Sequence, residues 1–204
     1  MAQSVQYTLM DGYAVRAITS STNASPIVVT DNNHGLETGD QVTIFGHATN
    51  TAANGLWTIT KVSDNTFSLD GSTGNGTGGA TGVWAQVQNP TVFVEDFSVM
   101  SISIDTDGGG DAAFTLKLWS SDQQDPPNPG AAQSPSNQYD FVDMIDKEDG
   151  ASIDGDTGFV VASSDDNRQF EANTNGARWM GILPTAGTEG EATVKFRLFK
   201  RPTP

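Results

Sequence analysis

The sequence predicts an all-β protein, and three observations support this. Nearly every apolar run in the 204 residues is short and alternates apolar with polar side chains, which is the two-residue period of a strand. Gly (22) and Pro (9) are frequent, as are Asn, Asp, Ser and Thr, and such residues build turns between strands. No segment shows a convincing 3.6-residue period. We therefore expect a small β-barrel module, a β-sandwich or jelly-roll-like domain, and no helix longer than about two turns.

The first half of the chain predicts the small module, at residues 18–88. SPIVVT and QVTIFG read as strands, and NGLWTITKVSDNTFSLDG reads as a hairpin that bends at Ser63-Asp64-Asn65. The glycine-rich tract at 71–82 is flexible in composition, and VWAQVQ closes the module. Asn89-Pro90 marks the boundary with the next unit.

Residues 1–17 precede this module and are unlike it. Either YTLM and YAVRAI pair with the C-terminal sheet, which makes the module an insertion in the sandwich, or two domains stand in tandem.

Residues 89–204 predict the sandwich domain. TVFVEDFSVMSISI is long for one strand, and its inward-facing set changes phase after Val99, which indicates a bulge or a crossing between two sheets. With the runs that follow, about seven strands are expected, enough for a sandwich. The runs are AFTLKLW, YDFVDMID, TGFVVAS, RQFEAN, ARWMGIL and EATVKFRLFK.

The longest irregular segment is Ser120 to Asn137, with four prolines and no large apolar residue. A loop of this length is either a mobile surface loop or an extended arm that lies across a neighbouring subunit.

Charge and composition limit the partners. The formal net charge of −15 disfavours nucleic acid and anionic membranes, and favours basic or apolar protein surfaces. Four of the ten basic residues lie in the last ten positions: Lys195, Arg197, Lys200 and Arg201. Without cysteine the chain has neither a disulfide nor a reactive thiolate. No signal peptide and no apolar run of about 20 residues is present, so we expect a protein made in a cytoplasm.

Catalytic chemistry is not indicated. A serine or threonine nucleophile needs a base, usually histidine, and both histidines, His34 and His47, fall in turns of the module. His34 is expected to cap backbone groups. No nucleotide-binding or zinc-binding spacing is present, so we expect no catalytic residue and no cofactor.

Two acid-rich segments leave a choice between a solvated face and a calcium site. The loop Asp105 to Asp111 has closely spaced oxygen ligands but departs from the EF-hand pattern at Gly109 and Leu116. The run Asp140 to Asp156 has seven acids against Lys147. We expect solvated turns and no metal site, with a divalent-cation site as the alternative.

The four tryptophans allow two interpretations, core packing or a sugar-binding platform. Trp57 and Trp179 lie within alternating runs and are expected in the core. Trp119 falls on the side of Lys117, opposite Leu116 and Leu118, so we expect it to be exposed or at an interface.

Residues 31–76 carry the words HGLETGDQVTIFG, ANGLW and DNTFSLDGSTG. This segment resembles the FCCH-like domain, named after ubiquitin-activating enzymes, that is common in tailed-phage virion proteins. Residues 134–181 resemble a segment that recurs in small phage virion proteins of unassigned function. The resemblance implies a viral structural context, without ubiquitin chemistry and without transferable functional residues.

From these features we expect a phage virion structural protein on the outer surface of the particle. The first expectation is a capsid decoration (cement) protein that forms a homo-oligomer, such as a trimer, and binds the major capsid protein. Its expected interface residues are Trp119, Lys195, Arg197, Lys200 and Arg201. The alternative is a tail, neck or head-fibre component that binds a receptor or glycan. A depolymerase, which requires a carboxylate pair in a groove, is a third reading.

Overall fold

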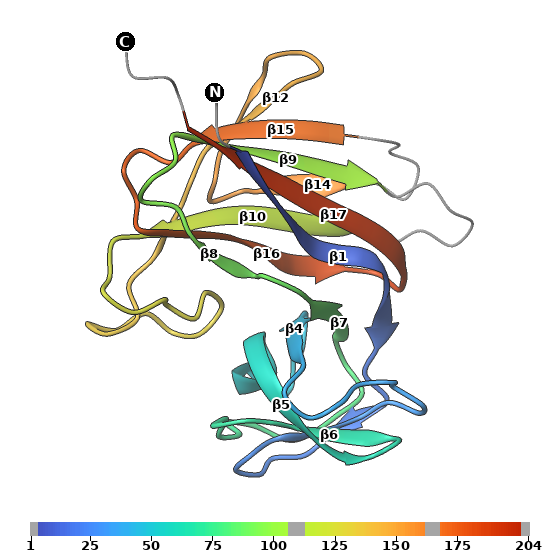
Figure 1. Cartoon of the computed structure of the whole chain (residues 1–204). Helices are drawn as coiled ribbons and strands as arrows, with labels where there is room; N and C mark the ends of the chain where they lie inside the picture. The colour runs from blue at the N-terminus through green and yellow to red at the C-terminus, as the bar shows by residue number, and fades with distance from the viewer. Residues whose placement is uncertain (1–3, 106–112, 162–167, 201–204) are drawn as a thin grey trace.

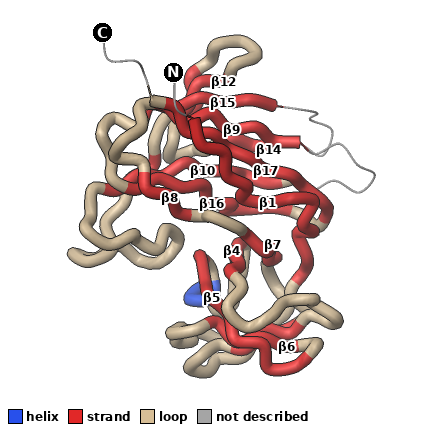
Figure 2. The backbone as a smooth tube through the Cα atoms, in the orientation of Figure 1, coloured by secondary structure: helices blue, strands red, loops and turns tan. Residues whose placement is uncertain are grey.

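The computed structural model describes residues 4–105, 113–161 and 168–200, and it confirms an all-β fold (Figure 2). Within these ranges the one helical element is a 3₁₀ turn, η1. In chain order the elements are β1 (Ser4–Ala17), β2 (Ser20–Ser21), β3 (Val28–Thr30), β4 (Gln41–Phe45), η1 (Thr51–Ala53), β5 (Gly55–Ser63), β6 (Thr66–Leu69), β7 (Val83–Val87), β8 (Thr91–Phe93), β9 (Val99–Asp105), β10 (Phe114–Ser121), β11 (Asp140–Phe141), β12 (Met144–Asp146), β13 (Ser152–Ile153), β14 (Phe159–Val161), β15 (Arg168–Asn173), β16 (Trp179–Gly187) and β17 (Gly190–Phe199).

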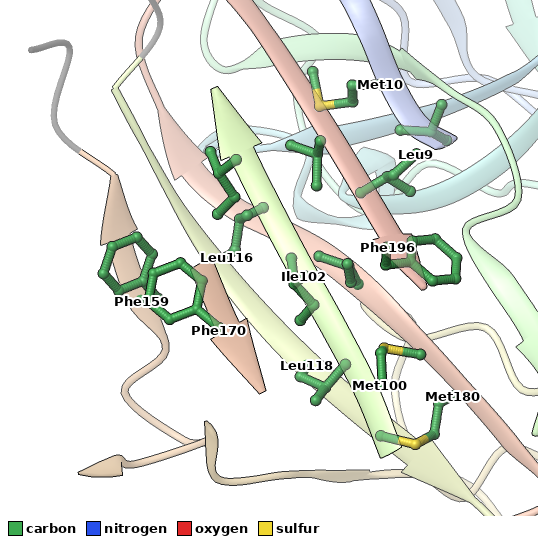
Figure 3. Close-up of a cluster of buried hydrophobic side chains, with 14 of the residues drawn as sticks. Leu9, Met10, Met100, Ile102, Leu116, Leu118, Phe159, Phe170, Met180 and Phe196 are labelled. Carbon is green, nitrogen blue, oxygen red and sulfur yellow. The ribbon is translucent and has the colours of Figure 1, made fainter. Parts of the chain in front are cut away.

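Two sheets form a sandwich in the upper part of Figure 1. One layer follows the order β13-β12-β15-β9-β17-β1, and the other follows β11-β10-β16-β8, with β14 paired to β10. Alternation along each strand directs apolar side chains between the layers. Ile102, Phe196 and Leu118 therefore meet in one core with Phe170 and Met180 (Figure 3).

The predicted phase change after Val99 is a crossing between the two sheets. β8 pairs with β16 in one sheet, whereas β9 pairs with β15 and β17 in the other. The chain turns between them, where the backbone N–H of Phe97 donates to the carbonyl of Val94 at 2.8 Å. The crossing lets one apolar run supply both faces of the core.

The N-terminal strand belongs to the C-terminal sheet. Residues 4–15 of β1 pair antiparallel with β17, starting with Ser4 opposite Phe199. The last two residues of β1, Arg16 and Ala17, pair instead with β7 of the module. β1 thus carries the chain out of the sandwich, and β8 returns it (Figure 1).

The module has its own core, formed around Ile27, Phe67 and Trp84. Its strands follow one path, β7-β4-β5-β6-β3-β2, and do not close into the expected barrel. The reason lies in the edges. β1 occupies the free edge of β7, and β2 at the other end has only two residues.

The proline-rich segment from Ser120 to Asn137 packs against the protein's own module. The Nδ2 of Asn128 donates to the carbonyl of Leu56 in β5 at 3.0 Å. A Cβ added to Gly130 would lie 2.7 Å from the Cα of Gly55, so only glycine permits this approach. Asn137 donates to the carbonyls of Asn128 and Ala132, which holds the segment's shape. In this fold the segment bridges the sandwich and the module.

Candidate contact surface

The outer face of the sheet β15-β9-β17-β1 gathers basic and small polar side chains, with the carboxylate of Glu171 in β15 at one end of a row. Alternation in β17 places Val194, Phe196 and Leu198 in the core, so Lys195 and Arg197 point outward. Register then builds two rows across the strands. Lys195 lies opposite Ser103 and Thr8, and Arg197 lies opposite Ser101 and Gln6.

These rows line a shallow groove of about 410 Å³, which we call the basic face. The serines of β9 form its low centre because their side chains are short. The basic face comprises Gln6, Ser101, Ser103, Lys147, Gln169, Lys195, Arg197 and Phe199.

The cations of this region are only loosely engaged. Lys195 lies 3.4 Å from the carboxylate of Asp11 with its side chain 41% exposed, and Arg197 donates to Gln6 Oε1 at 2.7 Å. Lys200 lies 3.7 Å from Asp96 and beside the ring of Phe97. Because exposed ion pairs contribute little to stability, these side chains can exchange partners at low cost. Arg201 lies outside the described residues.

Trp119 was expected at an exposed or interface position, and the structure corrects this, because its side chain is fully buried. It lies directly opposite Gly181 across β10 and β16. A Cβ on Gly181 would fall 2.6 Å from Cζ2 of the indole, so the ring occupies space that only glycine leaves. Because its side chain is buried, Trp119 has no surface to offer a partner.

The other tryptophans are anchored by their indole N–H groups. Trp57 and Trp179, expected in the core, are half-buried and donate to the carbonyls of Ala53 and Gln123. Trp84 is buried and donates to Asp31 Oδ2 at 3.0 Å. The arrangement does not form a row of exposed indoles for a sugar.

A serine–histidine pair is present in the module, which the sequence reasoning missed. Ser21 Oγ and His47 Nε2 lie 2.8 Å apart. The backbone N–H of Asn50 donates to His47 Nδ1 at 3.2 Å, so the imidazole proton is on Nε2. His47 therefore donates to Ser21 and cannot accept its proton. Both side chains are buried, and burial lowers the pKa of His47. The pair helps to hold the glycine-rich tract in place, because Ser21 Oγ also accepts a hydrogen bond from the N–H of Gly79.

His34 caps backbone groups, as expected. Its Nδ1 accepts from the N–H of Leu36 at 3.0 Å, and its Nε2 donates to the carbonyl of Ser63 at 2.8 Å. The ring packs edge-on against Phe67. It ties the segment after β3 to the β5–β6 turn.

The acids between Asp140 and Asp156 act mainly as caps of turns. Asp143 accepts from Gly155 N, Asp149 from Ala151 N, and Asp154 from Thr157 N. Asp146 is buried and pairs with Arg168. Among the described residues no three carboxylates or imidazoles converge as a metal-binding group. Most of the Asp105 to Asp111 loop lies outside the described residues.

The described part of the chain has no helix that is long and apolar enough to cross a membrane. Comparison of the sequence with protein-family models and with curated proteins finds no match.

Proposed function

We propose that this protein is a structural component of a tailed-phage particle, added to the outside of the head as a decoration protein. The FCCH-like words of residues 31–76 support the viral context. The net charge of −15 supports an outer position, because an acidic protein does not compete for the packaged DNA.

The observation that carries the proposal is the basic face. In a strongly acidic chain, Lys147, Lys195 and Arg197 line one groove of the sandwich. Such a face attracts an acidic surface on a neighbouring capsid protein. The sandwich would therefore be the part attached to the head. The module lies on the other side of the β1–β7 junction from the sandwich, so it would project away from the head (Figure 1).

A non-catalytic role and a homo-oligomer complete the proposal. The Ser21–His47 pair is buried, and His47 carries its proton on the nitrogen that faces Ser21. It therefore cannot act as the base that would activate the serine as a nucleophile. Oligomerisation, for example as a trimer, would shield the strands at the sheet ends, such as β8 and β13, from unwanted pairing.

The test is location and copy number in purified particles. Quantitative mass spectrometry against the major capsid protein, with electron microscopy of the particles, should find hundreds of copies distributed over the head. The double variant Lys195→Glu with Arg197→Glu should lower occupancy without lowering solubility. Lys61→Glu, a charge reversal in the module, is the matched control and should leave occupancy unchanged.

The second candidate is a tail, neck or head-fibre component that binds a receptor or glycan. A polar hollow at one end of the sandwich, lined among others by Gln123, Gln138 and Asn175, favours it. The same copy-number measurement separates the two, since a tail component is present in a few to tens of copies. A handful of copies confined to the tail would reject the decoration proposal.

A further inference from the structure

Three segments far apart in sequence enclose a hollow on the end of the sandwich. They are the end of β10, the segment that contains β11, and the turn between β15 and β16. The hollow measures about 650 Å³ and is lined among others by Gln123, Gln138, Tyr139, Asp140 and Asn175.

A second hollow of about 620 Å³ continues the first, because both are lined by Ser120, Asp140, Val142, Asn173 and Asn175. Together they form one trench, whose volume leaves room for more than one sugar ring. The trench shares no lining residue with the basic face.

The trench wall offers hydrogen-bonding groups that the described part of the protein leaves unused. The side-chain amides of Gln138 and Asn175 are exposed and have no hydrogen-bond partner there. Asp140 uses Oδ1 to accept from the N–H of Phe141, which leaves Oδ2 available. An amide offers two donors and an acceptor, and a carboxylate offers acceptors, which is the mixture that adjacent sugar hydroxyls require.

Two aromatic rings accompany these groups. Tyr139 lines the first hollow and Phe141 the second, and their rings meet edge to face at 5.7 Å. The hydroxyl of Tyr139 is held between Gly130 N and the carbonyl of Ala131. A fixed aromatic surface beside planar polar groups suits the apolar face of a pyranose ring.

The charges around the trench indicate which class of sugar it can bind. Asp122, Asp140, Asp143 and Glu171 line the two hollows. A nearby cation is Lys117, whose Nζ lies 4.7 Å from the centre of the Phe141 ring, so the acidic groups outnumber it. Anionic glycans are disfavoured there by like-charge repulsion. We propose that this trench binds a neutral or amine-bearing oligosaccharide.

The test is direct binding to the purified full chain, which needs no particle. Isothermal titration and saturation-transfer NMR would use oligomers of N-acetylglucosamine, of glucosamine and of galacturonic acid. Saturable binding of one or both of the first two, without binding of the third, is the expected result. Binding of none of the three, or of the galacturonic acid oligomer alone, would overturn the proposal.

Variants place the ligand in the trench. Asn175→Gly removes the amide and keeps the backbone, because Asn175 has φ 51°, which glycine adopts freely. Asn175→Gly and Gln138→Ala should each weaken binding about 3- to 10-fold, the effect of losing one hydrogen-bonding partner. Asp64→Asn, in the β5–β6 turn of the module, should leave binding unchanged. Binding that survives both trench variants at full strength would show that the trench is not the site.

Discussion

Arg16 and Asp31 form a two-pronged ion pair, with Arg16 Nε 2.8 Å from Asp31 Oδ2 and its NH2 group 3.0 Å from Oδ1. Trp84 adds a third donor to the same carboxylate, and the guanidinium lies 5.5 Å from the centre of the indole ring. Arg16 is one of the two β1 residues that pair with the module, so this cluster fixes the point where the sandwich strand enters it.

We expect Asp31→Ala to destabilise the protein by about 2–4 kcal/mol, because it leaves the buried Trp84 N–H without its acceptor and removes the carboxylate that pairs with Arg16. Arg16 keeps its hydrogen bonds to the carbonyls of Asn32 and Asn33. Urea unfolding followed by tryptophan fluorescence measures this. Glu37→Ala is the control, since the carboxylate of Glu37 is 76% exposed beside Lys61, and should change stability little. Equal effects from the two variants would refute the structural role of Asp31.

The buried His47 makes stability depend on pH. Burial lowers its pKa in the folded protein below the ordinary value of 6.5, so the unfolded chain binds the proton more readily. The contribution is complete above pH 6.5 and is lost progressively as the pH falls towards the folded-state pKa. Melting temperatures between about pH 7.5 and 5 should therefore decline.

His47→Gln isolates this contribution. The glutamine side chain stays neutral, so the variant should be less stable at pH 7.5 yet lose less stability on acidification than the wild type. The quantity to compare is the slope of stability against pH in the wild type and in the variant, because the carboxylates contribute equally to both slopes. Parallel pH profiles would mean that His47 does not sense pH in the folded state.

Alternation along single strands was sufficient to predict much of the sandwich. In β17 the sequence places Val194, Phe196 and Leu198 on one side and Lys195 on the other, and the structure agrees. The sheet crossing near Val99 was readable for the same reason, since a change of phase in an apolar run has few other causes.

Contacts between distant segments were not readable in this way. Trp119 alternates with the outward set, but the sequence did not show that Gly181 would stand opposite it and give its ring a buried place. Ser21 meets His47 only through the module's fold. The trench needs three segments, none of which carries a motif. Such sites depend on which strands pair with each other, and the pattern of residues within one strand does not encode that pairing.

Replacement of Gly181 tests the packing of Trp119. A methyl group at residue 181 would lie 2.6 Å from the indole and 2.0 Å from the carbonyl oxygen of Pro90. We expect Gly181→Ala to cost about 1–3 kcal/mol, as overpacking of a core does. Thermal unfolding measures the loss, and a shifted Trp119 environment should appear in near-ultraviolet circular dichroism. A variant as stable as the wild type, with an unchanged spectrum, would mean that the ring lies elsewhere.

The module should be removable. In a variant that lacks residues 18–88, a linker of about six Gly/Ser residues can join Ala17 to Asn89. Ala17 lies opposite Val83, and Gln88 lies about five residues further along that strand, so the linker must span about five residues of extended chain. The sandwich then keeps β1 paired with β17, but loses Phe45, Val83, Ala85 and Val87 from its core cluster. We expect a lower melting temperature with one cooperative transition, measured by calorimetry. Aggregation without a transition would show that the two units share one indispensable core.

Attachment through the basic face should weaken as salt rises. Lys195 and Arg197 are solvent-exposed enough to be screened, and the screening length falls from about 10 Å at 0.1 M salt to about 3 Å at 1 M. Purified protein added to particles that lack it should therefore show lower occupancy at about 0.5 M than at about 0.05 M NaCl. The variant Lys195→Ala with Arg197→Ala should bind less at low salt and show a shallower salt dependence, because fewer charge pairs remain to be screened. Occupancy that is independent of salt, or a salt dependence that the double variant leaves unchanged, would place the attachment on another surface of the protein.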